Sequence, residues 1–75
     1  MATEDPQTSA AEIYAVEVED GDQGWEVRIV GSAGTGPVVS LRHCATETEA
    51  RTYASTVIQH LDWLSVPKFR EYYRV

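Results

Sequence analysis

The sequence predicts an α+β domain of the order β-β-β-α: a three-stranded antiparallel meander sheet packs on one long C-terminal helix, and a short extra C-terminal helix follows. Up to residue 44, apolar side chains recur at every second position, the period of a strand. From residue 46 they recur every three or four residues, the period of a helix. The connections between the strand-like runs are short and rich in glycine, which favours antiparallel pairing.

We expect strands at residues 12–19, 25–30 and 38–44. The face that packs on the helix is expected to carry the alternating large apolar residues, namely Tyr14, Val16, Val18, Trp25, Val27, Ile29, Val39 and Leu41. On this alternation, Arg28 and Arg42 both lie on the outer face of the sheet, away from the helix.

The start of the long helix is marked by Thr46 and Glu49, which fit a capping box. The helix is expected to run from residue 47 to about residue 64, where Ser65 and Pro67 end its pattern and begin the short extra helix. Its buried face is expected to consist of Ala50, Tyr53, Ala54, Val57, Ile58, Leu61 and Leu64.

The chain divides into a predicted disordered N-terminal tail at residues 1–11 and a single β-β-β-α(α) domain at residues 12–75. The tail is small and polar and contains Pro6, so it lacks the apolar side chains that a folded segment buries. The domain is small, and with no disulfide to reinforce it we expect a modest core. Such a domain is a candidate for self-association or for stabilisation by a partner.

The net charge of −6 at pH 7 opposes binding to nucleic acid, because affinity for phosphate backbones comes mainly from lysine and arginine. Cys44 is the single cysteine and has no partner for an internal disulfide. The N-terminus lacks the basic and apolar stretches of a signal peptide, and no apolar run is long enough to cross a membrane. We therefore expect a cytoplasmic protein that does not bind membranes.

We expect no enzymatic activity, no cofactor and no bound metal, because the sequence contains no recognisable catalytic constellation. Two arrangements deserve comparison with that expectation: a zinc site from His43, Cys44 and His60, and a nucleophilic Cys44 with His60 as its base. Neighbouring strand residues point to opposite faces, so His43 and Cys44 would not converge on one metal ion.

The C-terminal segment is rich in aromatic residues and arginine, the residue types enriched where proteins bind one another. The candidate partner-binding residues are Trp63, Phe69, Arg70, Tyr72 and Tyr73. A second candidate surface is the outer face of the sheet, partly apolar through Ile13, Ala15, Val30 and Val38, together with an open strand edge. We therefore expect a small acidic, non-catalytic interaction module, binding a protein partner or forming a homodimer, in an accessory or regulatory role.

Two motifs mark the sheet and the start of the helix: Trp25-x-Val27-x-Ile29 and Thr46-x-x-Glu49-Ala50. Over residues 12–64 their arrangement resembles, in outline, the arm-site-binding domains of tyrosine recombinases and the plant AP2 domain. The resemblance implies an alternative function, nucleic-acid binding by the outer sheet face through Arg28 and Arg42. Those families place several cations and a base-reading aromatic on that face, whereas here it also carries Glu17 and Glu26. A further alternative is an acidic surface that imitates DNA.

Overall fold

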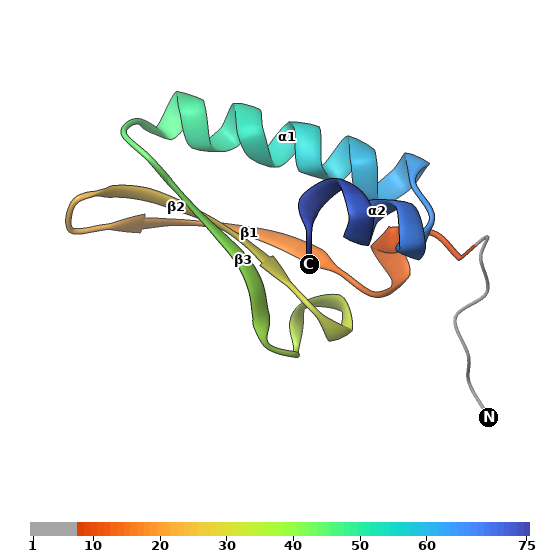
Figure 1. The fold of residues 1–75 in the computed structure, drawn as a ribbon. Helices are drawn as coiled ribbons and strands as arrows, with labels where there is room; N and C mark the ends of the chain where they lie inside the picture. Colours follow the sequence, from red (N-terminus) through yellow and green to blue (C-terminus); the bar gives the residue numbers. More distant parts are fainter. Residues whose placement is uncertain (1–7) are drawn as a thin grey trace.

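The computed structural model describes residues 8–75 and confirms the predicted α+β fold (Figure 1). Three strands form an antiparallel meander in the order β1-β2-β3: Ala15–Gly21, Gly24–Val30 and Val38–Cys44. The long helix α1 spans Glu47–Trp63, and the short helix α2 spans Val66–Tyr73. Two short 3-10 turns, Ala10–Glu12 and Ser32–Gly34, precede β1 and follow β2.

Helix α1 begins where the capping box predicts. The Thr46 hydroxyl oxygen accepts a hydrogen bond from the Glu49 backbone N–H at 3.2 Å, and the same hydroxyl donates to the Glu49 carboxylate at 3.3 Å. The first of these bonds satisfies a backbone N–H that the first turn of a helix leaves without an intrahelical partner, and the second holds the two side chains together. Helix α2 ends at Arg74, whose left-handed backbone (φ 59°) stops the helical hydrogen-bonding pattern.

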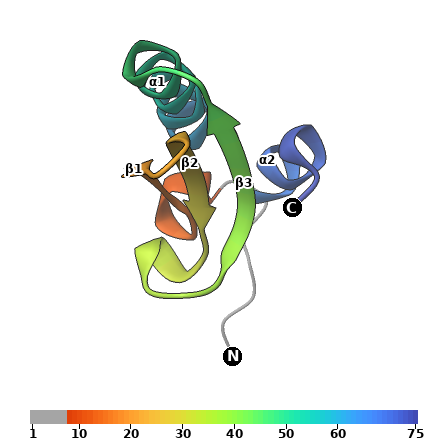
Figure 2. The same ribbon diagram turned by 90° about the vertical axis from the view of Figure 1, so that its left-hand side faces the viewer.

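Helix α1 lies along one face of the sheet, α2 lies beside β3, and the opposite face has no helical layer (Figures 1 and 2). The main core joins the first 3-10 turn, the sheet and both helices, and consists of Ala10, Tyr14, Ile29, Val57, Leu61, Val66 and Phe69. A smaller cluster of Val27, Ala50 and Ala54 holds the start of α1 against the sheet.

The fold begins earlier in the chain than the sequence indicates. Residues 1–7 of the predicted tail lie outside the described residues, but residues 8–11 do not form a tail. Ala10 is fully buried, and its N–H donates to the Leu64 carbonyl at 3.0 Å. The Ser9 hydroxyl donates to the Leu61 carbonyl at 2.7 Å. A small residue such as alanine gives little hydrophobic signal, so this anchor was not visible in the sequence.

The predicted facing of the third strand is wrong. The register places Arg42 opposite Val27, on the side of α1, and Leu41 opposite Arg28, on the outer face. Val39 and Leu41 are accordingly 38% and 50% exposed and not part of the core. A shift of one residue turns every side chain of a strand to the other face, and the irregular pairing at Ile29/Val30 marks where β3 departs from regular alternation.

Ile58 is also exposed, contrary to its predicted place on the buried face of α1. The buried residues of α1 are Ala50, Ala54, Val57 and Leu61, and they form a narrower stripe than the sequence indicates. Among the described helices, none has the length and apolar character that crossing a membrane requires.

Candidate interaction surface

Strand β3 is an edge of the sheet, since it pairs with β2 alone. Three of the large apolar side chains exposed in the described structure lie on it: Val38, Val39 and Leu41. An edge strand also presents backbone N–H and C=O groups that no neighbouring strand satisfies. Strand β3 therefore offers both apolar contact and hydrogen bonds to an incoming chain.

The alternation of hydrogen bonds in the sheet shows which backbone groups of β3 are free. The two-residue turn between β1 and β2 closes on the pair Gly21–Gly24, so even-numbered residues of β2 direct their backbone groups toward β1. The backbone N–H and C=O groups of the odd-numbered residues of β2 then point toward β3. The bond from the Gly31 N–H to the Pro37 carbonyl, at 2.9 Å, follows the same alternation.

On the other side of this ladder, Arg42 is the β3 residue directly opposite Val27. Arg42 therefore directs its backbone groups toward β2, and its neighbours Leu41 and His43 direct theirs to the free edge. The side chains of Leu41 and His43 both lie on the outer face of the sheet, since they pair with Arg28 and Glu26.

The two edges of the sheet differ in charge. Strand β1 carries Glu17, Glu19 and Asp20, and charged side chains on an edge discourage pairing with another chain. Strand β3 carries no carboxylate, and no Asp or Glu occurs anywhere from residue 27 to residue 46. In a chain of net charge −6, this segment contains two arginines and one histidine. The β3 edge therefore opposes pairing with another acidic chain less than the β1 edge does.

The centre of the outer face is occupied by an ion-pair network around Arg28. Its guanidinium hydrogen-bonds the carboxylates of Glu19 and of Glu26, the latter at 3.0 Å, and lies 3.8 Å from that of Glu17. The hydrogen bond to Glu19 is the largest influence that raises the pKa of Arg28 above its usual value. Arg28 is thus engaged with three carboxylates of its own sheet.

Arg28 and Arg42 do not share a face, contrary to the prediction for nucleic-acid binding. The Arg42 guanidinium lies 4.6 Å from the centre of the Tyr53 ring of α1, on the helix side of the sheet. Arg28 lies on the outer face among glutamates. The pair of outward-facing cations that the resemblance to DNA-binding domains implied is not formed.

The apolar part of the outer face is smaller than predicted. Val30 is only 4% exposed. The loop after β2 turns back toward β1, where the Ala33 N–H donates to the Ile13 carbonyl at 2.7 Å and Gly34 lies beside Ala15. The exposed apolar surface of the sheet is thereby confined to β3.

The helix side of β3 is open as well. A groove of about 450 Å³ runs between β3 and α1 and is lined by Arg42, Cys44, Tyr53 and a row of threonines that includes Thr52 and Thr56.

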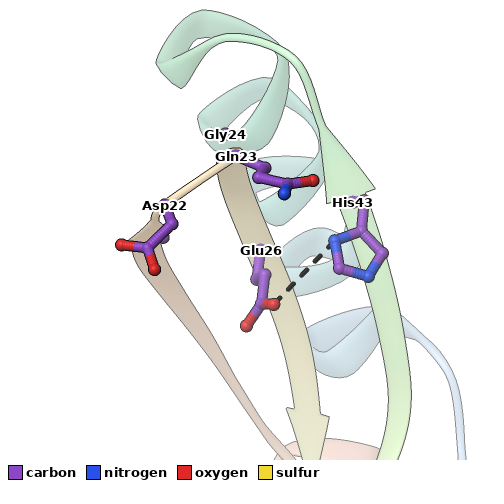
Figure 3. A pocket seen from close by; sticks show the side chains of 6 residues that line it. Asp22, Gln23, Gly24, Glu26 and His43 are labelled. Atoms are coloured by element: carbon purple, nitrogen blue, oxygen red, sulfur yellow. Dashed lines mark ion pairs between the residues drawn. The ribbon is translucent and has the colours of Figure 1, made fainter.

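A second hollow, of about 540 Å³, lies at the tip of the β1–β2 hairpin (Figure 3). His43 and Glu26 face each other across it, with His43 Nδ1 and Glu26 Oε2 3.8 Å apart. The Asp22 side chain points away from both (Figure 3). One carboxylate and one exposed imidazole make a single contact here and not a binding pocket.

The C-terminal aromatic residues divide between core and surface. Phe69 is fully buried and stacks on Tyr14, with ring centres 5.1 Å apart, which removes it from any surface that a partner contacts. Arg70 Nε donates to the Tyr14 hydroxyl at 2.8 Å. Trp63 and Tyr72 are 75% and 64% exposed, so these two keep the exposure that partner binding requires.

Tyr73 is half-buried, and its hydroxyl lies 2.6 Å from His60 Nδ1. Burial, followed by the neighbouring Tyr53 and Tyr72, raises the pKa of Tyr73 to about 12. The contact fastens α2 to the last turns of α1, so Tyr73 and His60 serve to hold the two helices together.

His60 and Cys44 do not form the pair that nucleophilic catalysis would need. Cys44 packs beside the Val27 cluster near the start of α1, whereas His60 lies near the other end of that helix, against Tyr73. Within residues 8–75, no group of three His, Cys, Asp or Glu side chains is placed to hold a metal ion.

Compared with known proteins, the chain matches no protein-family model, no curated protein and no solved structure. The surface described above therefore has to be interpreted from its own chemistry. Sequence reasoning missed the free backbone groups of Leu41 and His43. The long stretch without carboxylates between residues 27 and 46 was the signal that pointed to them.

Proposed function

We propose that this protein is a non-catalytic interaction module that binds a protein partner, or a second copy of itself, by pairing a strand with the free edge of β3. The observation that carries this proposal is the edge itself. It exposes three large apolar side chains and carries no carboxylate, and its one arginine, Arg42, lies over the Tyr53 ring on the helix side.

Strand addition uses two kinds of contact. The backbone groups of Leu41 and His43 supply hydrogen bonds, each worth about 0.5–1.5 kcal/mol net. The exposed parts of Val38, Val39 and Leu41 supply apolar contact. The sum is modest, which suits reversible binding in an accessory or regulatory role.

The nucleic-acid alternative has less support. Its two arginines point to opposite sides of the sheet, and Arg28 is neutralised by glutamates. Imitation of DNA has less support for a related reason. The carboxylates of the described residues are spread over the outer face, the hairpin tip and the start of α1, and the three on the outer face surround a cation.

The proposal is tested by placing a photo-cross-linking amino acid at Leu41 and, as a matched control, at Gln59 on the exposed side of α1. In cells of the native host, we expect a discrete adduct from position 41 and none from position 59. The mass of the adduct tells whether the neighbour is another protein or a second copy. Equal cross-linking from both positions, or none from either, would contradict the proposal.

A further inference from the structure

We infer that the occupant of the β3 edge is a second copy of this chain, paired antiparallel with Leu41 at the two-fold axis. This inference rests on the proposed function and names its partner. A two-fold dimer brings the same patch of both copies together, so the patch must be complementary to itself. Strand β3 meets that condition in its backbone and its apolar residues, and it carries no carboxylate.

The backbone limits the choice of pairing. Leu41 and His43 direct their hydrogen-bonding groups outward, so the residues that exchange hydrogen bonds across the axis must be odd-numbered in both copies. Val39 lies at the irregular pairing between β2 and β3, so we consider only the outward groups of Leu41 and His43. Built from these two residues, two symmetric arrangements place the axis at or next to the middle of the strand. In one, Leu41 lies opposite the partner's Leu41. In the other, Leu41 lies opposite the partner's His43.

Charge distinguishes these two arrangements. If Leu41 lies opposite the partner's His43, the axis passes beside Arg42, which then faces the partner's Arg42 in a close pair. Like charges directly opposite each other destabilise a sheet. If Leu41 lies opposite the partner's Leu41, Arg42 faces the partner's Ser40, a small polar residue. The second arrangement also brings the two outward-facing leucines into contact on the outer face.

The overall acidity of the chain makes β3 the suitable place for self-pairing. Copies of net charge −6 repel one another, and the segment from residue 27 to residue 46 is the one long stretch without a carboxylate. Strand β1, the opposite edge, carries three carboxylates. Pairing of β1 of one copy with β3 of the next would leave a free edge at each end and build an open filament. Pairing of β3 with β3 forms a closed dimer.

The shape of the molecule is compatible with a short paired stretch. Helix α2 lies on the β3 side of the molecule, toward the Val38 end of the strand and away from its Cys44 end (Figures 1 and 2). With Leu41 at the axis, the paired stretch is centred on Ser40, Leu41 and Arg42 of each copy. On the helix side, the groove beside Arg42 and Tyr53 of each copy adjoins the axis and leaves it uncovered.

The first test is sedimentation equilibrium of the purified chain from low to high micromolar concentration. We expect a monomer–dimer equilibrium that Leu41→Lys weakens by about 100-fold or more, because two lysines would then face each other at the axis. Ile58→Lys is the matched control. Ile58 is 46% exposed on α1 against 50% for Leu41, so this variant adds the same charge at similar exposure and leaves the dimer intact.

The second test maps the pairing by disulfide formation in a Cys44→Ser background, which leaves no other thiol. Directly opposed, hydrogen-bonded residues have Cα atoms about 5.5 Å apart, within the range that a disulfide spans. We expect Leu41→Cys to form a cross-linked dimer and Arg42→Cys to remain uncross-linked. The reverse result would overturn the arrangement with Leu41 at the axis.

A wild-type chain that stays monomeric at high micromolar concentration would overturn self-pairing. The photo-cross-linking experiment at Leu41 then separates the two conclusions. An adduct with a different protein would leave strand addition standing with another occupant. The absence of any adduct would remove the proposed function together with this inference.

Discussion

Replacement of Phe69 by alanine is the most direct test of how the C-terminal segment contributes to the protein. Phe69 is fully buried, stacks on Tyr14, and has its ring centre 4.7 Å from that of Tyr73. Removing such a ring costs the transfer free energy of the lost atoms and leaves a cavity, for a total of about 3–5 kcal/mol. A chain of 75 residues has a free energy of unfolding of about 4–11 kcal/mol at about 0.05–0.15 kcal/mol per residue.

Phe69→Ala should therefore lose about a quarter or more of the stability. The measurement is urea denaturation followed by far-UV circular dichroism. Tyr72→Ala is the matched control, since it removes an aromatic ring from the same helix at a position that is 64% exposed. We expect this control to cost less than about 1 kcal/mol.

A loss of less than about 1 kcal/mol for Phe69→Ala, comparable with that of the control, would refute the assignment of Phe69 to the core. If Phe69→Ala does not fold, Phe69→Leu keeps the test quantitative. Leucine retains most of the volume and should cost about 1–1.5 kcal/mol.

Three further substitutions test the turn, the helix cap and the contact between the helices. Gly24 has φ +130°, and a Cβ there would lie 2.7 Å from the Cys44 carbonyl oxygen, so Gly24→Ala should lower the unfolding free energy by about 2 kcal/mol. At Gly21 an added Cβ would lie 3.7 Å from the Gly24 carbonyl oxygen, an ordinary contact, so Gly21→Ala should change the unfolding free energy little. Thr46→Ala removes the cap of α1 and should cost about 1 kcal/mol in thermal or urea unfolding. Tyr73 ionises at a pKa of about 12 when folded but at about 10 when unfolded, so its contribution is complete below pH 10 and lost as the pH rises toward 12. Tyr73→Phe should flatten that alkaline loss in urea titrations at successive pH values, and an unchanged slope would contradict the assignment.

Much of the fold could be predicted because local and global signals agree. The alternation around Val27 and Ile29 gives the central strand, and both residues are buried as expected. The pairing of Thr46 with Glu49 gives the first turn of α1. In each case one short stretch of sequence contains the whole signal.

The rest depends on contacts between distant parts of the chain. Ala10 is buried because it packs against the end of α1, where its N–H donates to the Leu64 carbonyl. The residues next to Ala10 in the sequence do not indicate this contact. Phe69 and Tyr72 have similar side chains, yet one is buried and the other exposed, because only the docking of α2 decides which face turns inward. Periodicity places residues on faces, but it does not say which face meets the core.

For strand β3 too, periodicity did not say which face meets the core. Here that error concerns the proposed docking edge. The inward face of β3 carries Ser40 and Arg42, while its outward face carries Val38 and Leu41, the opposite of what a strand shaped only by its own core would show. Departures of this kind from local rules are concentrated at functional sites. Leu41→Thr distinguishes a role of Leu41 in the stability of the monomer from a role in pairing at the β3 edge. It removes apolar surface that is already half in solvent, so the monomer should keep its stability within about 0.5 kcal/mol, whereas pairing at the edge should be lost. If Leu41→Thr instead destabilised the isolated monomer, the outward leucine would be a structural residue, and the case for a docking edge at β3 would lose its main support.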